Sequence, residues 1–242
     1  MKIIGIIPSR YASTRFPGKP LIDIGGKTMI RRVYEQASKS KSLSQVIVAT
    51  DDERIFNEVK SFGGNVVMTA AEHKNGTERC AEVVANLDAD VVINIQGDEP
   101  FIEPSQIDAL AECFSEPSTQ IATLVRVIDW DDELRIPSRI KVVLNNLSEA
   151  MYFSRSIIPN PVSHFHRDEL VFYLHVGIYG FRKNVLLDVV KLEPTLLEIT
   201  ESLEQLRWLE NGYKIKCGFT GHSGTAIDTP EDLENLDLDS LA

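Results

Sequence analysis

The chain has few cysteines and no long apolar run, and each shortage excludes a class of protein. Its three cysteines (Cys80, Cys113 and Cys217) are far apart and odd in number. This suits free thiols in a reducing compartment rather than a disulfide framework or a zinc site. No apolar run approaches the roughly 20 residues of a transmembrane helix. The apolar run at residues 3–7 is too short for a signal peptide, so we expect a cytoplasmic protein.

Positive charge is also in deficit. The 242 residues carry a formal net charge of -11 at pH 7. A nucleic-acid groove needs a broad basic face, so we expect neither a nucleic-acid partner nor insertion into a membrane. A single nucleotide needs only a local positive pocket, and the acidic balance leaves that open. The apolar fraction of 43% is enough for a packed core.

Three common catalytic patterns are missing. No G-x-G-x-x-G follows a predicted strand, so a dinucleotide site is unsupported. The run Gly25-Gly26-Lys27-Thr28 is similar to the end of a phosphate-binding loop, but Leu21 stands where that motif requires glycine. No Ser or Cys lies in a nucleophile-elbow pattern.

Apolar, β-branched runs alternate with amphipathic stretches in the first 120 residues. Strands are predicted at 3–7, 45–50, 66–68 and 91–95, and helices at 28–40, 52–62, 77–87 and 104–115. This alternation predicts an α/β fold with a mainly parallel central sheet and helices on both faces.

The pattern changes near residue 121. Strands at 121–127, 140–144 and 173–181, joined by irregular segments, predict a smaller α+β lobe. A helix at 200–210, a strand at 213–219 and a helix from 229 return to the α/β rhythm. We therefore expect a single domain over 1–242, with 1–120 and 182–242 as the main body and 121–181 as the smaller lobe.

A cationic loop, residues 8–20, follows the first predicted strand. The first 22 residues contain no acid and four cations: Lys2, Arg10, Arg15 and Lys19. Arginine offers a planar fork to phosphate oxygens, and lysine offers a point charge. An open α/β sheet binds ligands at the carboxyl ends of its strands. The sequence therefore favours an anion site over a solvated surface loop.

Two aspartates could ligate a metal. Asp98 follows the predicted strand 91–95, and it is either an Mg²⁺ ligand or a turn residue. Its position at a strand end favours the ligand. Asp228 precedes a strong helix start, with Thr229 as N-cap and Pro230 as first helical residue. That start needs no function, and spacing alone leaves the role of Asp228 undecided.

Two further groups of polar residues have competing interpretations. His175, Gly177 and Tyr179 share one face of a predicted strand. They form either a pocket wall or the surroundings of a structural histidine. Glu204 and Gln205 flank the apolar stripe of a predicted helix, which by itself favours surface residues.

Motifs along nearly the whole chain resemble the 3-deoxy-D-manno-octulosonate (Kdo) cytidylyltransferase family, also called CMP-Kdo synthetases. Eight motifs occur in the expected order, which is more specific than any one of them. Ser9 and Asn75 depart from the commoner alanine and serine of the family. The motifs are 10–21 (R-Y-A-S-T-R-F-P-G-K-P-L), 48–51, 76–79, 96–100, 152–155, 175–180, 203–207 and 228–233.

The resemblance implies an enzyme that transfers CMP from CTP to Kdo, giving CMP-Kdo and pyrophosphate for the inner core of lipopolysaccharide. It also implies a Rossmann-like nucleotidyltransferase fold, Mg²⁺ as cofactor and a cytoplasmic homodimer with the smaller lobe at the contact. A related acceptor such as 8-amino-Kdo or a sialic acid is one alternative, and the motifs at 96–100 and 152–155 favour Kdo over sialic acid. A non-catalytic, nucleotide-binding regulator is another, and the pair Asp98 and Asp228 argues against it.

The resemblance also assigns residues. Arg79, with the backbone near Pro8 and Ser9, would contribute to the selection of cytosine. The full set for CTP would be Pro8, Ser9, Arg10, Ser13, Arg15, Lys19, Gly76, Arg79 and Asp98. The catalytic set would be Lys19, Arg10, Asp98 and Asp228, of which the two aspartates would hold Mg²⁺. The sugar acid would be bound by Gln96, Arg155, His175, Tyr179, Glu204 and Gln205.

Overall fold

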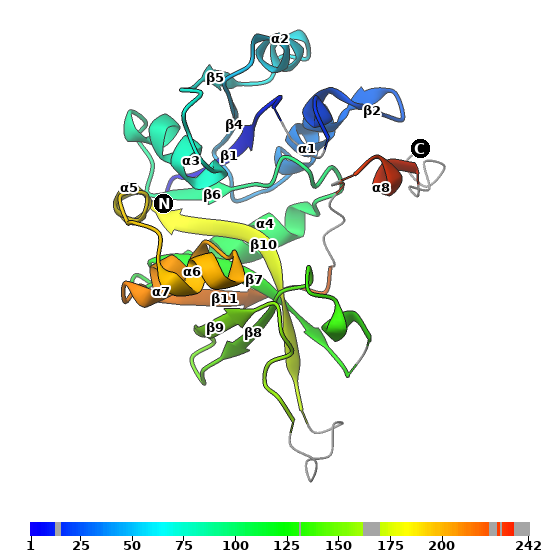
Figure 1. Ribbon diagram of the computed structural model, residues 1–242. Helices are drawn as coiled ribbons and strands as arrows, with labels where there is room; N and C mark the ends of the chain where they lie inside the picture. Colours follow the sequence, from blue (N-terminus) through cyan, green and yellow to red (C-terminus); the bar gives the residue numbers. More distant parts are fainter. Residues whose placement is uncertain (13–15, 131, 162–169, 223–226, 228, 235–242) are drawn as a thin grey trace. The chain divides into compact units, whose positions relative to one another are not determined.

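The computed structural model describes residues 1–12, 16–130, 132–161, 170–222, 227 and 229–234 (Figure 1). The chain divides into two compact units. The first comprises residues 1–108 and 224–242, and the second residues 109–223. In the described part of the chain, no helix combines the length and the apolar character that crossing a membrane requires.

The first unit is built on a parallel sheet of four strands in the order β6-β1-β4-β5. Its central strand β1 is buried along almost its whole length, as expected for a strand with neighbours on both sides and helices in the connections. The strands are β1 (Ile3–Ser9), β4 (Gln45–Thr50), β5 (Val66–Met68) and β6 (Val91–Asn94).

Side-chain caps fix where the connecting helices begin. Thr28, Asp52 and Asn75 each accept a hydrogen bond from a backbone N–H in the first turn of the helix that follows. The helices are α1 (Met29–Ala37), α2 (Glu53–Ser61), α3 (Gly76–Ala85) and α8 (Pro230–Glu234), and α4 (Pro104–Glu112) begins in the first unit and ends in the second. Shorter pieces are η1 (Lys19–Leu21), β2 (Asp23–Ile24) and β3 (Lys27–Thr28).

In the second unit, β7 (Ile121–Ile128) pairs antiparallel with β10 (Phe172–Arg182) and parallel with β11 (Ile215–Phe219). β8 (Lys141–Leu144) pairs antiparallel with β10 and with β9 (Ala150–Ser154). The remaining elements are η2 (Cys113–Ser115), η3 (Asp132–Arg135), α5 (Lys183–Val189), α6 (Leu196–Glu201) and α7 (Gln205–Glu210).

The predicted α/β class with a mainly parallel sheet is confirmed, and two details differ. The predicted smaller lobe covered residues 121–181, whereas the second unit runs from 109 to 223, because β11 pairs along β7. The prediction of one helix over 200–210 is wrong. Ser202 adopts a left-handed conformation with φ 52°, and this separates α6 from α7.

The crowding around Gly180 gives a test of the packing in the second unit. A Cβ atom at Gly180 would lie 2.6 Å from Cε2 of Phe114, which is only 1% exposed and therefore has no space to move into. We expect Gly180→Ala to destabilise the protein by about 1–3 kcal/mol, measured by thermal or urea unfolding.

Gly177 on the same strand is the matched control, because a Cβ there would meet no atom within 4 Å. Gly177→Ala should leave the melting temperature close to that of the parent. Equal melting temperatures for the two variants would contradict this description of the core.

Candidate active site

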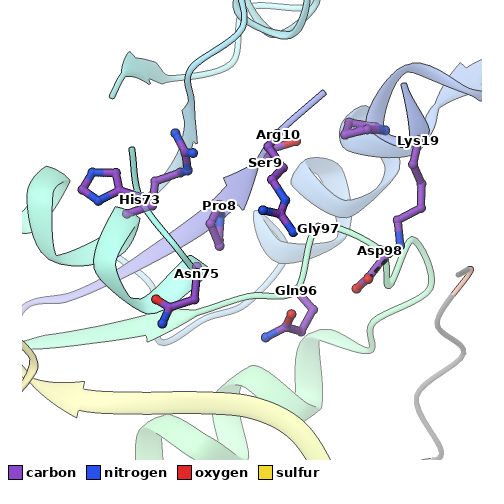
Figure 2. A pocket seen from close by; sticks show the side chains of 12 residues that line it. Pro8, Ser9, Arg10, Lys19, His73, Asn75, Gln96, Gly97 and Asp98 are labelled. Carbon is purple, nitrogen blue, oxygen red and sulfur yellow. Dashed lines mark hydrogen bonds and ion pairs between the residues drawn. The ribbon is translucent and has the colours of Figure 1, made fainter. Parts of the chain in front are cut away.

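A cavity of ≈ 240 Å³ lies at the carboxyl ends of β1 and β6 in the first unit. Parallel strands bring their carboxyl ends to one edge of the sheet, so the segments that follow them meet there. Figure 2 shows side chains from these segments around the cavity. It is lined by Pro8, Ser9, Arg10, Lys19, Pro20, His73, Asn75, Gly76, Arg79, Gln96, Gly97 and Asp98.

Seven of the nine residues predicted to bind CTP line this cavity, and Gln96 from the predicted sugar set joins them. The other two, Ser13 and Arg15, lie outside the described residues, as does Asp228. The structure therefore brings together every predicted CTP residue that it describes. Their role in binding CTP stays a prediction.

An ion pair connects the cationic loop to the end of β6. Nζ of Lys19 lies 2.9 Å from Oδ2 of Asp98, and the two side chains are 14% and 29% exposed. In Figure 2 the Lys19 side chain extends directly toward Asp98. The pair places a phosphate-binding type of cation and a metal-binding type of carboxylate at one point of the cavity wall.

Backbone geometry explains how the loop and the strand end come so close. Gly18, with φ 75°, precedes η1, and its N–H donates to the carbonyl of Tyr11 (3.0 Å). Gly97 lies against the end of β1, where a Cβ atom would be 3.0 Å from the carbonyl oxygen of Pro8. A side chain at position 97 would therefore push the Asp98 segment away from β1.

Arg79 forms part of the wall through a network of hydrogen bonds. Its side chain is buried, and it donates to the hydroxyl of Thr69, to the carbonyl of Ala70 (3.2 Å) and to Oδ2 of Asp51 (3.2 Å). The pair with Asp51 balances the buried charge. Arg79 thus fixes the segment that follows β5 against α3. A contribution to the selection of cytosine stays a prediction.

Four residues that the sequence did not assign also line the cavity: Pro20, His73, Asn75 and Gly97. Asn75 caps α3, because its Oδ1 accepts from the N–H of Glu78 (2.9 Å). The spacing of an N-cap asparagine and a glutamate three residues later could have indicated this helix start. His73 is held by the carboxylate of Glu82, and this contact carries no signal in the sequence.

Two buried polar atoms at the ends of β1 and β6 lack a hydrogen-bond partner among the described residues. They are the hydroxyl of Ser9 and Oδ1 of Asn94. Glu99 is also buried, and burial together with the neighbouring Asp98 raises its pKa to about 7. Buried polar atoms in native proteins are usually satisfied, so an unpaired hydroxyl in a cavity wall fits a site that binds a polar ligand.

The donor set fits Mg²⁺ better than a softer metal. Within the described ranges, no group of three or more His, Cys, Asp or Glu side chains could hold a metal ion. Mg²⁺ is commonly held by one or two carboxylates and by substrate phosphates, so Asp98 beside a cationic loop is sufficient protein contribution. Ile227, the residue before Asp228, donates its N–H to the carbonyl of Asp98 (2.9 Å).

The remaining five residues of the predicted sugar set belong to the second unit. His175 contacts the hydroxyl of Thr123 (2.9 Å), and burial lowers the pKa of His175 to about 3. The rings of His175 and Tyr179 are 5.2 Å apart, and Tyr179 packs edge-on against Trp208 of α7. The hydroxyl of Tyr179 is buried without a hydrogen-bond partner in the described chain.

Arg155, Glu204 and Gln205 lie at or near the turn between α6 and α7. Arg155 donates to the carbonyls of Glu201 and Ser202 at this turn. Gln205 is buried, and the carboxylate of Glu204 lies 3.8 Å from Arg207. The expectation that sequence alone gave for Gln205, a surface position, is wrong, because α7 begins there and turns this side chain inward. Binding of a sugar acid by these residues stays a prediction.

Comparison with known proteins gives the family. The family model described as "Cytidylyltransferase" matches residues 4–215. The 3-deoxy-manno-octulosonate cytidylyltransferase of Parabacteroides distasonis is 55% identical, with 97% of this chain and 96% of the relative covered. That of Bacteroides thetaiotaomicron is 53% identical, with 98% and 97% covered.

Comparison with solved structures supports the same family. A CMP:2-keto-3-deoxy-manno-octonic acid synthetase complexed with CTP is 42% identical, with a TM-score of 0.92 over 97% of this chain and 96% of that chain. A 4-diphosphocytidyl-2C-methyl-D-erythritol synthase from Anaerococcus prevotii, only 15% identical, has a TM-score of 0.65 over 100% and 99% of the two chains, and shows the shared nucleotidyltransferase fold. The chain thus belongs to the cytidylyltransferase family, among the 3-deoxy-manno-octulosonate cytidylyltransferases.

Proposed function

We propose that this chain transfers CMP from CTP to Kdo, giving CMP-Kdo and pyrophosphate. The observation that carries the proposal is the meeting of Arg10, Lys19 and Asp98 in one cavity, in a chain more than half identical to enzymes named for this reaction. The product would serve the inner core of lipopolysaccharide. A cytoplasmic location accords with this role and remains a prediction.

The reaction is an in-line displacement at phosphorus. The anomeric hydroxyl of Kdo releases its proton to solvent as its oxygen forms a bond to the α-phosphorus of CTP, and the bond from that phosphorus to the pyrophosphate oxygen breaks. Pyrophosphate leaves with the electron pair. The protein's task is to position the two substrates and to offset negative charge as it moves onto the leaving group.

Different residues of the cavity would bind the phosphates, the base and the metal ion. Lys19, held in place by Asp98 at 2.9 Å, and the exposed Arg10 would bind phosphate oxygens and offset the charge of the leaving pyrophosphate. The walls built by Gly76 and Arg79 would enclose the base. Asp98, with Asp228, would hold Mg²⁺, which when bound lowers the negative charge on the phosphate oxygens.

The proposal is tested by pyrophosphate release with CTP and Mg²⁺, comparing Kdo, 8-amino-Kdo and N-acetylneuraminate as acceptors. We expect release with Kdo to exceed release with N-acetylneuraminate by at least about 100-fold, because a site built for one acceptor's polar groups rejects an acceptor that leaves them unpaired. Release only with another acid would contradict the assignment of Kdo as acceptor and leave the assignment of CTP unchanged. Binding of CTP without release for any acceptor would support a regulatory role instead.

Replacement of Asp98 tests the site itself. We expect Asp98→Asn to lower the turnover rate by about 100-fold or more, because the variant loses a carboxylate charge at the phosphates. Lys19→Met should weaken CTP binding as well as turnover. Thermal unfolding should change little, since the partly exposed pair contributes at most about 1 kcal/mol.

The matched control is Asp88→Asn, whose carboxylate is 95% exposed and pairs only with Lys2 among the described residues. It should retain the parent's rate. A folded Asp98→Asn enzyme with a near-normal rate would contradict the role given to this carboxylate.

We also propose that the chain forms a homodimer through the second unit. Exposed apolar side chains gather on two elements there. Met151 of β9 is 62% exposed, and Leu196 and Ile199 of α6 are 75% and 66% exposed. Ser154 of β9 donates to Glu201 of α6 (2.7 Å), so these two elements lie together. Apolar patches of this kind commonly mark protein interfaces.

Sedimentation at several protein concentrations tests the dimer. The parent should sediment as a dimer, and Leu196→Glu with Ile199→Glu should shift it toward the monomer, because two buried carboxylates are costly in an interface. A dimer unchanged by both substitutions would place the contact elsewhere.

A further inference from the structure

One buried cation in the second unit has no part in the site described so far. Lys141, the first residue of β8, is 0% exposed. Its ammonium donates to three backbone carbonyls, those of Ile136 (3.2 Å), Arg139 (2.7 Å) and Arg155 (2.5 Å). Within the described residues, no carboxylate lies within ion-pair distance of this ammonium.

Burial of an ammonium without a paired carboxylate is costly. Burial lowers the pKa of Lys141, and the effect of Glu201, which raises it, is opposed by that of Arg155. A neutral side chain of similar length could fill the same volume at lower cost. Packing alone therefore does not explain why a charged ammonium occupies this position.

The contacts of Lys141 lead directly to Arg155. The backbone of Arg155 is held at both ends, because its carbonyl accepts from Lys141 and its N–H donates to the Glu201 carboxylate (2.9 Å). The guanidinium donates to the carbonyls of Glu201 (2.7 Å), Pro137 (3.2 Å) and Ser202 (3.2 Å). Among the described residues, backbone carbonyls thus accept from three of the five guanidinium N–H groups, which leaves two for a ligand.

This arrangement also fixes the turn that carries Glu204. Ser202, the left-handed residue between α6 and α7, is bound by Arg155 through its carbonyl. Ser154 donates to the same Glu201 carboxylate (2.7 Å). Figure 1 shows β8 and β9 side by side, near α6 and α7. Lys141 and Arg155 both act on one carboxylate, Glu201, while Glu204 and Glu198 share Arg207.

We propose that Lys141 is a positioning and specificity-determining residue for the acidic acceptor. Its ammonium holds the Arg155 backbone and adds positive charge beside the guanidinium, so that the two remaining N–H groups of Arg155 are presented to the acceptor's carboxylate. Lys141 itself touches no substrate. The inference rests on the proposed function and deepens it, because it explains why the acceptor must carry a carboxylate.

The test is steady-state kinetics with CTP, Mg²⁺ and Kdo on the full chain, for the parent, Lys141→Met and Lys141→Gln. Methionine keeps the length and removes the charge, and glutamine keeps two N–H donors for the carbonyls, which preserves a folded variant. We expect KM for Kdo to rise about 10-fold or more in both, with KM for CTP unchanged and kcat altered less than about threefold. Lys191→Met, at an exposed lysine of the same unit, is the control and should match the parent.

A double-mutant cycle with Arg155→Lys separates positioning from a general loss of structure. Arg155→Lys should raise KM for Kdo much less in the Lys141→Met variant than in the parent, because the guanidinium is already displaced in that variant. Folded Lys141 variants with a parental KM for Kdo would overturn the inference and leave the proposed function intact. Fully additive effects of the two substitutions on KM for Kdo would do the same. Lack of turnover by the parent with every acidic sugar would overturn the proposed function, and this inference with it.

Discussion

The ion pair between Lys19 and Asp98 is the contact on which the site depends. It joins the loop after β1 to the segment after β6, two parts of the chain separated by 79 residues. The parallel sheet places both at one edge, and Gly97 lets the Asp98 segment approach the carbonyl of Pro8. In the free protein each partner neutralises the other. Phosphates and a metal ion would need these same two charges, so the pair keeps both groups in place without committing either to a permanent structural role.

Buried cations serve a second purpose in this acidic chain: they hold irregular segments whose carbonyls have no strand or helix partner. Arg79 binds the carbonyl of Ala70. Lys141 binds three carbonyls at once. Each of these contacts spans parts of the chain that local sequence pattern treats as loop. The walls of both predicted binding regions are built this way, which gives a loop the precision that a binding site requires.

Much of the first unit could be predicted from sequence, because its strands are apolar runs and its helices carry capping residues such as Asp52 and Asn75. The cavity followed from the rule that ligands bind at strand ends, together with the cations Arg10 and Lys19. What could not be predicted depends on contacts between distant residues. The left-handed Ser202 breaks a helical pattern that looks continuous, and it is held by Arg155. His73 enters the cavity wall through Glu82. The hydrogen bonds from Lys141 to three carbonyls could not be predicted from periodicity or composition.

The most direct measurement of the central claim is a crystal structure of this chain with CTP and Mg²⁺ bound. We expect CTP in the cavity at the carboxyl ends of β1 and β6, with Nζ of Lys19 moved from Asp98 to a phosphate oxygen and the Asp98 carboxylate facing the metal. A complex in which CTP phosphates lie elsewhere, with the 2.9 Å pair of Lys19 and Asp98 unchanged, would contradict it.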